Sequence, residues 1–433
     1  MHFSLFRAFG YFIGGIWTSW GGRRRIEAKQ LSRLRRLVKE VRRESPLFKE
    51  LYRNLPQSHH IILQDLPVTF KTDLMKDFDR WLTIRTLTLN QARAHMEDMK
   101  NLGVPIEGVV VFRTSGTSGE PAVIVLPPSH WEYVLGISFA RMETNQIKLV
   151  FKARKAGFNV SIAGGNGHFG GIGVNKLFKN ILPRSFQHFP FVAAEKPLEQ
   201  LIKQLNDMKN VATITTYPSV LMILTKEKEA GRLQIEPLVI KVAGETLTDE
   251  AKMRAQKAFP SLEYPIINAY ATTECLFIAH ECSYGRQHVC EDWVILEPVD
   301  IIMKPVPDGT LSDKALLTVL SNHVQPFIRY ELGDRLRFYK DACPCGSPFR
   351  SFQVEGRQAT LIHIGDVNLS PLIFDLEHER AQRVQLVQLN EKVFEVRAEL
   401  TSTVDSDTIF DEIIQSVRNV FDENGLPEVE LKR

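Results

Sequence analysis

Short apolar runs rich in β-branched residues alternate with helical segments between Val109 and His280, and this alternation restricts the fold more than any other feature of the sequence. The expected strands are Val109–Phe112, Ala122–Leu126, Val211–Thr215, Leu238–Val242 and Ile266–Tyr270. The expected helices are Pro197–Asn210, Ser219–Ala230 and Thr248–Phe259. The last two begin at residues that cap helices well. Strands that alternate with helices predict an α/β domain.

The remaining sequence predicts helices before this region and a smaller domain after it. Arg25–Tyr52 has the pattern of one or two amphipathic helices, and strands return between Val294 and Phe338. The expected elements near the end of the chain are a strand region at Val384–Leu400, a helix at Asp407–Phe421 and a short strand at Val429–Leu431. We therefore expect a large α/β domain over residues 1–355, a hinge near Gly356–Arg357, and a small, mobile α+β domain over residues 356–433.

Composition excludes several classes of protein. A chain of 433 residues with 44% hydrophobic and 24% charged residues has room for more than one ordinary globular domain. Its net charge of +3 is too small to indicate a protein that binds nucleic acid. Five cysteines in so long a chain do not make a disulfide scaffold, so we expect a cytoplasmic protein. The sequence leaves an oligomer open.

The N-terminal stretch MHFSLFRAFGYFIGGIWTSWGGRRR is rich in aromatic residues and ends in arginines. Its positive charge follows the apolar part, which is the reverse of a secretory signal, and its glycines and polar residues disfavour a membrane-spanning helix. One interpretation is an amphipathic segment on a membrane surface, with Trp17 and Trp20 at the interface. The other, which we expect, is a segment packed on the domain.

The segment VVVFRTSGTSGEPAVIV, Val109–Val125, predicts two strands joined by a loop with almost no side-chain bulk. Gly116 and Gly119 allow close approach of the backbone to a ligand. The loop also offers hydroxyl groups from Thr114, Ser115, Thr117 and Ser118. Backbone N–H groups in such a turn form an anion-binding nest, so phosphate is the expected ligand. The alternative is an ordinary hairpin turn, since the lysine of the P-loop pattern is absent.

Three further segments carry side chains suited to a nucleotide. INAYATTEC places Tyr270, Thr272, Thr273 and Glu274 at the end of an expected strand, where ligands bind in open α/β sheets. FIRYELGDRLRF places Asp334 next to a glycine, and VEGRQATLIHIGDVNLSP places Arg357 at the expected hinge. Taken singly, each has an ordinary structural explanation.

Taken together, these segments resemble the adenylate-forming superfamily of acyl- and aryl-CoA synthetases, in particular the phenylacetate–CoA ligase branch and its capsule-biosynthesis (CapK-like) relatives. TSGTSGEP is similar to the phosphate loop, AGET to the adenine-side motif, YATTE to the acyl-adenylate motif, RYELGD to the ribose motif and EGR to the hinge. TTYPSVLMIL and VNLSP also resemble this branch. The resemblance covers roughly Leu51 to Pro371.

The resemblance implies that a carboxylic acid, aryl or acyl, is activated with ATP as an acyl-adenylate and then transferred to the thiol of coenzyme A or of an acyl carrier protein. It implies catalytic roles for Thr273, at the α-phosphate, and for Glu274, which would hold Mg²⁺. It implies that the following residues bind the nucleotide: Thr114, Ser115, Gly116, Thr117, Ser118 and Gly119 at the phosphates, Gly244, Glu245 and Tyr270 at the adenine, Asp334 at the ribose, and Arg357 at the hinge.

The sequence departs from the superfamily pattern in several places. Ala122 stands where a lysine is common, and Gln358 stands where an acidic residue is common. The chain ends in ENGLPEVELKR, without the glycine-rich loop that normally carries a catalytic lysine, and Lys432 is the only late lysine. The alternative function is therefore a nucleotide-binding protein of the same fold with little or no catalysis, acting as a partner in a biosynthetic assembly.

Cysteine placement predicts a structural zinc site. ECSYGRQHVC contains Cys282 and His288, and DACPCG contains Cys343 and Cys345. Three cysteines and one histidine make a tetrahedral zinc set, and the resemblance to the phenylacetate branch supports it. The alternative is that these are reduced, buried cysteines.

GGNGHFGG matches, in a formal sense, the glycine fingerprint of dinucleotide-binding proteins. Its extra glycines, Gly171 and Gly173, predict that no regular helix opens there, and no acidic residue ends a clear second strand. In the adenylating interpretation this region lines the acid pocket, with His168 and Phe169 as its candidate walls.

Overall fold

The computed structural model describes residues 3–56, 60–114, 121–165, 167–181, 188–194, 196–357, 362–365, 367–369, 374, 376, 378, 380–400 and 405–433. The chain divides into two compact units, Met1–Gly356 and Arg357–Arg433. Each unit has its own hydrophobic core.

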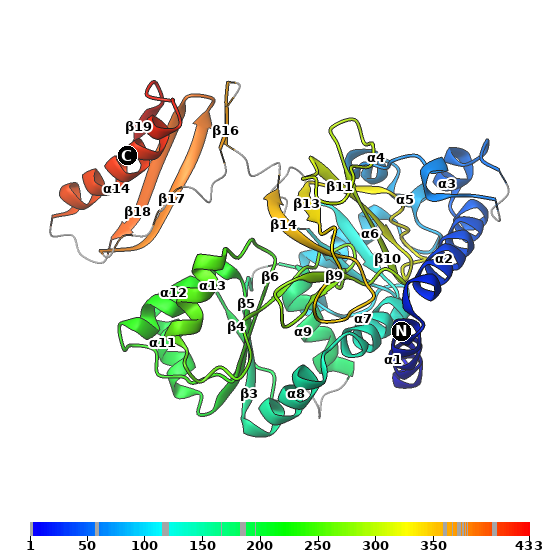
Figure 1. The fold of residues 1–433 in the computed structure, drawn as a ribbon, viewed down its shortest axis with the longest axis horizontal. Helices are drawn as coiled ribbons and strands as arrows, with labels where there is room; N and C mark the ends of the chain where they lie inside the picture. The colour runs from blue at the N-terminus through cyan, green and yellow to red at the C-terminus, as the bar shows by residue number, and fades with distance from the viewer. Residues whose placement is uncertain are drawn as a thin grey trace. The chain divides into compact units, whose positions relative to one another are not determined.

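A five-stranded parallel sheet forms one part of the large unit (Figure 1). Its strands, in spatial order, are β4 (Phe191–Ala193), β3 (Phe158–Ala163), β5 (Val211–Thr216), β6 (Val239–Ala243) and β7 (Ile267–Ala269). The helices between them are α9 (Gly170–Ile181), α11 (Leu198–Asp207), α12 (Pro218–Glu229) and α13 (Asp249–Ala258), and α8 (Thr144–Ala156) precedes β3. The sequence predicted β5, β6, β7, α11, α12 and α13, and their bounds agree within a few residues, whereas β3, β4, α8 and α9 were not among the expected elements.

Helices cover both faces of this sheet, which is why its strands read as continuous apolar runs. One face packs Ile214, Ile240 and Val242 against leucines of α11 and α12. The other face packs Ala212 and Val239 against α8. Burial on both sides leaves only the strand ends open to a ligand.

The other strands of the large unit are antiparallel. β1 (Val110–Arg113) and β2 (Val123–Leu126) form a hairpin followed by α7 (Pro128–Ala140). One three-stranded sheet has the order β10 (Val294–Val299), β11 (Lys314–Val319) and β12 (Tyr330–Leu332). A four-stranded sheet has the order β13 (Asp334–Phe338), β14 (Ser351–Arg357), β9 (Gln287–Val289) and β8 (Ala279–Glu281).

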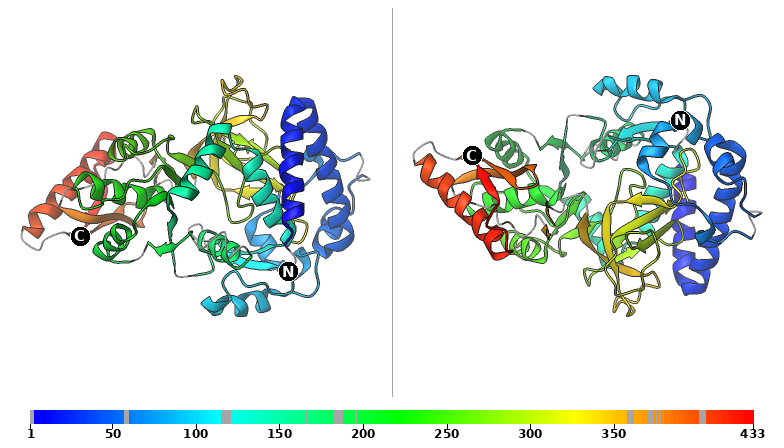
Figure 2. Two further views of the ribbon diagram at one scale, coloured as in Figure 1. Left: turned by 90° about the horizontal axis from the view of Figure 1, so that it is seen from below. Right: turned by 90° about the horizontal axis from the view of Figure 1, so that it is seen from above.

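Two long helices, α1 (Leu5–Trp20) and α2 (Gly22–Glu44), lie side by side at one edge of the large unit (Figure 2). The shorter helices that follow are α3 (Pro46–Leu51), α4 (Lys71–Lys76), α5 (Phe78–Trp81) and α6 (Leu89–Glu97). α1 packs closely on α7, because a Cβ atom on Gly136 would lie 2.2 Å from the carbonyl oxygen of Ala8. The expectation that this segment packs on the domain is confirmed for one face of α1. No helix in the described part of the chain is both long and apolar enough to cross a bilayer.

The small unit is an α+β structure. A hairpin of β17 (Ala381–Asn390) and β18 (Val393–Leu400) pairs with β19 (Glu430–Lys432), which runs parallel to β18. α14 (Ser406–Glu423) packs Ile409, Ile413, Val417 and Phe421 into the core of this unit. A separate two-stranded pair, β15 (Ile362–Ile364) and β16 (Val367–Leu369), lies nearer the boundary in sequence.

Helix α9 corrects one prediction from the sequence. The extra glycines of GGNGHFGG argued against a regular helix, yet α9 opens at Gly170 and contains Gly171 and Gly173. A Cβ atom on Gly173 would lie 1.9 Å from the ring of Phe112 in β1. The glycine is therefore required for close packing between the helix and the β1–β2 hairpin, and this tertiary requirement outweighs its low helix propensity.

A buried ion pair connects the N-terminal helices to the strand layer. The Arg141 guanidinium donates to Asp292 Oδ1 at 2.6 Å, and both side chains are almost fully buried, at 1% and 0% exposure. Arg141 also donates to the carbonyl oxygen of Gly15 in α1 at 3.0 Å. Arg33 of α2 lies 3.4 Å from Asp292 Oδ2. One carboxylate thus ties α7, α1 and α2 to the segment that follows β9.

We predict that Arg141→Met lowers the free energy of unfolding of the large unit by about 3–5 kcal/mol, because it leaves the buried Asp292 charge poorly compensated. Chemical denaturation followed by tryptophan fluorescence measures this loss. The matched control is Lys152→Met, which removes a pair to Glu263 that is 59% and 39% exposed. It should change stability by less than about 1 kcal/mol. An equal effect of both substitutions would contradict the assigned role of Arg141.

Candidate functional site

The base of the glycine-rich loop is held by hydrogen bonds between its two ends. The Thr114 N–H donates to the Ala122 carbonyl oxygen at 3.0 Å, and the Ala122 N–H donates to Thr114 Oγ1 at 2.9 Å. The hydroxyl of Thr114 therefore accepts a bond that closes the hairpin. Ser115, Gly116, Thr117, Ser118 and Gly119 lie outside the described residues, so their phosphate-binding role stays a prediction.

Two motifs that are far apart in sequence meet at the carboxyl end of β7. Tyr270 follows β7 directly, and its hydroxyl donates to Asp334 Oδ2 at 2.8 Å. Asp334 is the first residue of β13 and is 3% exposed. The sequence predicted that the YATTE and ELGD motifs serve one nucleotide, and the fold brings these two side chains into direct contact.

Thr273 and Glu274 lie in the segment between β7 and β8. Glu274 is buried, and the Tyr330 hydroxyl donates to its Oε1 at 3.4 Å. Thr273 lies beside the first residue of α9, since a Cβ atom on Gly170 would be 3.7 Å from Thr273 Oγ1. The N-terminus of α9 carries unpaired N–H groups and a positive partial charge, which favour an anionic group near Thr273.

The loop after β6 contains Gly244 and Glu245. Gly244 has a φ of +91°, and a Cβ atom there would lie 3.3 Å from the ring of Tyr217. The Glu245 carboxylate accepts from the Ser219 N–H at 2.9 Å and from the Ser219 hydroxyl at 3.0 Å, in the first turn of α12. The Glu245 carboxylate therefore stabilises the first turn of α12, a contact that the sequence analysis did not anticipate.

Tyr217 is a site residue that the sequence analysis did not single out. Its ring lies beside Gly244, and its hydroxyl would be 3.8 Å from a Cβ atom on Gly171 of α9. The available signal was an aromatic residue at the end of an expected strand, directly before the helix that begins at Pro218. Together with Tyr270 it places two aromatic side chains next to the expected adenine motif.

His168 and Phe169 precede α9 and pair with the end of β1. The Arg113 N–H donates to the His168 carbonyl oxygen at 2.8 Å, and the Arg113 guanidinium lies 4.8 Å from the Phe169 ring centroid. The His168 ring is buried, its Nε2 lies 3.1 Å from the Asp98 carbonyl oxygen, and burial lowers its pKa. A neutral His168 whose Nε2–H donates to this carbonyl fits these contacts. Their place in an acid pocket stays a prediction.

The hinge motif also lies close to the expected adenine motif. A Cβ atom on Gly356, whose φ is +105°, would lie 4.0 Å from Thr246 Oγ1, just after Glu245. Arg357 is the last residue of β14. Gly356 and Thr246 are therefore neighbours within the large unit, and the role of Arg357 stays a prediction.

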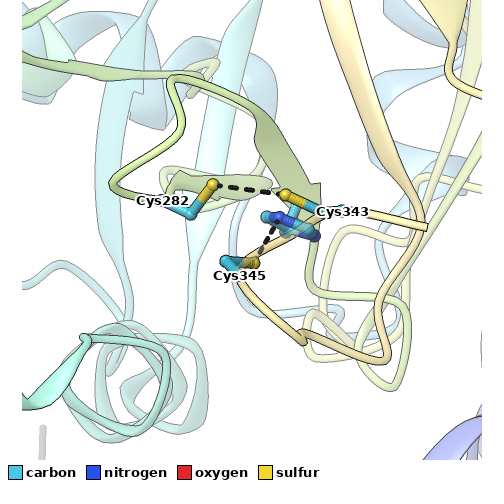
Figure 3. Close-up of side chains that lie close together, drawn as sticks. Cys282, Cys343 and Cys345 are labelled. Atoms are coloured by element: carbon cyan, nitrogen blue, oxygen red, sulfur yellow. Dashed lines mark hydrogen bonds between the residues drawn. The ribbon is translucent and has the colours of Figure 1, made fainter. Parts of the chain in front are cut away.

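The four predicted metal ligands converge between β8, β9 and the loop from β13 to β14 (Figure 3). Their ligand atoms all lie within 4.8 Å of one another: Cys282, His288, Cys343 and Cys345. Cys282 Sγ is 3.7 Å from Cys343 Sγ, and Cys345 Sγ is 3.4 Å from His288 Nε2. Bonds of about 2.3 Å to sulfur and about 2.0 Å to nitrogen in a tetrahedron place ligand atoms at about such separations.

The histidine of this cluster is oriented for metal binding. His288 Nδ1 lies 2.9 Å from the Phe349 carbonyl oxygen, which accepts a hydrogen bond from a protonated Nδ1 and leaves Nε2 with the lone pair that faces the cluster. Cys275 and Cys290 are buried outside the cluster. The donor set, its separations and this carbonyl fit a structural Zn²⁺ ion.

Lys241 is a second residue that the sequence analysis missed. It interrupts the apolar strand β6, three residues before Gly244. Its side chain is partly buried, and the loss of hydration in this position disfavours the charged amine and lowers its pKa. The signal that would have identified it is a lysine inside an otherwise apolar parallel strand, a position that normally excludes charge.

Solved structures of ligases share this fold. The structure of 2-hydroxyisobutyryl-CoA ligase in the postadenylation state, in complex with 2-HIB-AMP, has a TM-score of 0.63 and 17% identity over 94% of this chain and 85% of that chain. The same ligase with 2-HIB-AMP and CoA, in the thioesterification state, has a TM-score of 0.56 and 18% identity over 94% and 86%. GH3.15 acyl acid amido synthetase has a TM-score of 0.57 and 14% identity over 94% and 85%.

At these identities the likeness establishes the fold, and it confirms the expected α/β architecture with a small C-terminal α+β part. Neither a protein-family model nor a curated relative matches the sequence.

We predict that Lys241→Met raises the thermal midpoint of the large unit, because it removes a charge held in a poorly solvated position at a cost of about 1 kcal/mol. The folded-state pKa of Lys241 lies below its ordinary value of 10.5, so the unfolded chain binds more protons at this group. The free energy of unfolding of the natural chain, minus that of Lys241→Met, should therefore increase as pH rises from the lowered folded-state pKa to 10.5, and should level off above pH 10.5. Thermal denaturation at several pH values tests this. A stability difference that is independent of pH, or a less stable variant, would contradict it.

Proposed function

We propose that this chain is an ATP-dependent ligase that activates a carboxylic acid, aryl or acyl, as its acyl-adenylate. The observation that carries the proposal is the contact between Tyr270 and Asp334, two residues of separate nucleotide motifs that are hydrogen-bonded at 2.8 Å. It occurs in a chain whose fold matches, over 94% of its length, a ligase solved with an acyl-AMP. Among such ligases we assign it to the phenylacetate–CoA ligase and CapK-like branch, on its motifs.

In the first step a carboxylate oxygen of the acid attacks the α-phosphorus of ATP. The new P–O bond forms as the bond to the bridging oxygen breaks, and pyrophosphate leaves with that electron pair. Thr273, which lies beside the N-terminus of α9, donates a hydrogen bond to the α-phosphate, where negative charge develops. Glu274 would hold a Mg²⁺ ion, which would neutralise phosphate charge. Asp334 accepts from the ribose hydroxyls, and Tyr270 and Gly244 frame the adenine.

In the second step a thiol attacks the acyl carbon, and AMP leaves. Coenzyme A is the expected acceptor, with an acyl carrier protein as the alternative, and one structural neighbour was solved with CoA in the thioesterification state. Residues 356–433 act as the mobile small domain. Lys432 lies in β19, is 51% exposed and is 3.6 Å from Glu430, a contact typical of a surface side chain.

Acid-dependent exchange of pyrophosphate into ATP, screened over aryl and acyl acids, tests the first step. Exchange with at least one acid supports the ligase. ATP binding without exchange for any acid would favour the alternative, a nucleotide-binding partner in a biosynthetic assembly, and would contradict the proposal.

We predict different kinetic effects for the two carboxylates of the site. Glu274→Gln removes charge stabilisation that acts in the transition state, so it should lower kcat for exchange by about 100-fold or more. Asp334→Asn weakens a ribose contact and should mainly raise the KM for ATP, by an amount equivalent to about 1–3 kcal/mol. Lys432→Ala is the control and should change neither. A loss of turnover in the Lys432 variant alone would show that the C-terminal strand reaches the reaction.

The zinc site belongs to the same proposal as a structural element. We predict one zinc ion per chain in gently purified protein, by metal analysis. Cys343→Ser should release the zinc and lower the thermal midpoint, because structural zinc contributes directly to folding. Cys275→Ser, at a buried cysteine outside the cluster, should keep the zinc. Protein without zinc, or equal zinc loss in both variants, would refute the site.

A further inference from the structure

One face of α1 presents large apolar side chains to solvent. We define the aromatic stripe as the following residues, with their exposed fractions: Phe6 85%, Phe9 59%, Ile13 42%, Trp17 64% and Trp20 82%. Their spacing of three or four residues places them on one side of the helix, and Leu5, 55% exposed, lies beside them. Isolated exposed apolar residues are ordinary, but six of them on one helix form a continuous apolar surface.

The opposite face of α1 is fixed to the large unit, so the stripe cannot turn inward. Ala8, Gly15 and Thr18 are buried, and a Cβ atom on Gly15 would lie 2.8 Å from Ala140 Cβ in α7. The Arg7 guanidinium donates to both carboxylate oxygens of Glu132, a side chain that is 1% exposed. Close packing and this ion pair hold α1 with its aromatic stripe toward solvent.

The helices α1 and α2 carry an excess of positive charge, although Arg7, Arg23 and Arg33 form ion pairs with acids of the large unit, Glu132, Glu291 and Asp292. No acidic residue precedes Glu27, and α1 and α2 together, Leu5–Glu44, hold eleven arginines and lysines against three glutamates. These two helices therefore carry +8, whereas the whole chain carries +3 and the rest of the chain carries −5. Arg25 lies 5.7 Å from the ring centroid of Trp17 in the stripe, and Arg24 and Lys29 are exposed.

We propose that α1 docks the protein on the surface of an anionic phospholipid bilayer, lying in the interface with the aromatic stripe toward the acyl chains. Tryptophan and phenylalanine on one side, with arginine and lysine beside them, are typical of helices that lie in this interface. The cationic groups of α2 attract lipid phosphates. A second copy of the chain is disfavoured as the occupant, because its own positive helices would repel these.

This inference changes the expectation from the sequence, in which packing on the domain and contact with a membrane were alternatives. The structure accommodates both, because α1 packs with one face and exposes the other. The proposal does not depend on ligase activity, since the stripe and its charges are described without reference to the nucleotide site.

Co-sedimentation of the full chain with vesicles tests the proposal. The natural chain should pellet with vesicles of phosphatidylcholine containing about 30% phosphatidylglycerol, and much less with pure phosphatidylcholine. Binding should weaken as salt rises from about 0.1 M to about 1 M. The double variant Trp17→Ser, Trp20→Ser should lower the partition coefficient by about tenfold or more. Arg24→Gln and Lys29→Gln should each lower it by up to about fivefold on the anionic vesicles.

The matched control is Phe151→Ser on α8, which removes an aromatic side chain that is 56% exposed but lies outside the stripe. It should bind vesicles like the natural chain. Thermal denaturation should show that every variant keeps its fold, because the substituted side chains are exposed. Tryptophan emission gives a second measurement. Trp81 and Trp131 are buried and Trp293 is partly buried, so a blue shift on binding that disappears in the Trp17→Ser, Trp20→Ser variant would come from the stripe.

Absence of binding to the anionic vesicles, or equal loss in the Phe151 control, would overturn the proposal. So would a concentration-dependent dimer in solution that the tryptophan double variant abolishes, because the stripe would then bind a second copy. Vesicle binding without pyrophosphate exchange would leave this inference standing while the proposed function fails.

Discussion

The buried pair of Arg141 and Asp292 is the interaction on which the arrangement of the large unit depends. Asp292 follows β9 of the sheet that holds the metal cluster, whereas Arg141 ends the helix that follows the β1–β2 hairpin. Arg141 also reaches α1 through the carbonyl of Gly15, and Arg33 of α2 reaches the same carboxylate. Because a charge in the interior must be compensated, these elements are held in one fixed arrangement. That arrangement also decides which face of α1 meets solvent.

The proposed nucleotide site follows from the geometry of a parallel sheet. All strands of such a sheet end at the same edge, so the loops after β6 and β7 converge although they are separated in sequence. β13 then brings Asp334 to Tyr270, and α9 brings its N-terminus to Thr273. Side chains and a helix N-terminus placed at one edge of a sheet suit a reaction that is catalysed mainly by positioning the reactants and neutralising charge. The proposed membrane contact lies on helices outside this sheet.

The strands β5, β6 and β7 and the helices α11, α12 and α13 were predictable because each has a local pattern that burial in a covered sheet requires. The convergence of Cys282, His288, Cys343 and Cys345 was predictable because three cysteines and a histidine are rarely placed together for another reason, and the zinc ion itself stays a prediction. Local patterns did not predict the hydrogen-bond partner of Glu245 or the formation of helix α9. A carboxylate after a strand gives the same sequence pattern whether it binds a ligand or accepts a hydrogen bond from the first turn of a helix. Glu245 accepts from the first turn of α12. Glycines that disfavour a helix in isolation are required in α9 by the ring of Phe112.

The sequence by itself determined the α/β architecture, the order of its elements and the residue types gathered in each motif, because periodicity and turn chemistry act over a few residues. The tertiary structure decided which motifs touch, and it turned one face of α1 toward α7 and the other toward solvent. These outcomes depend on contacts between residues far apart in the sequence, 64 positions for Tyr270 with Asp334 and 125 positions for Arg7 with Glu132, which no local pattern encodes.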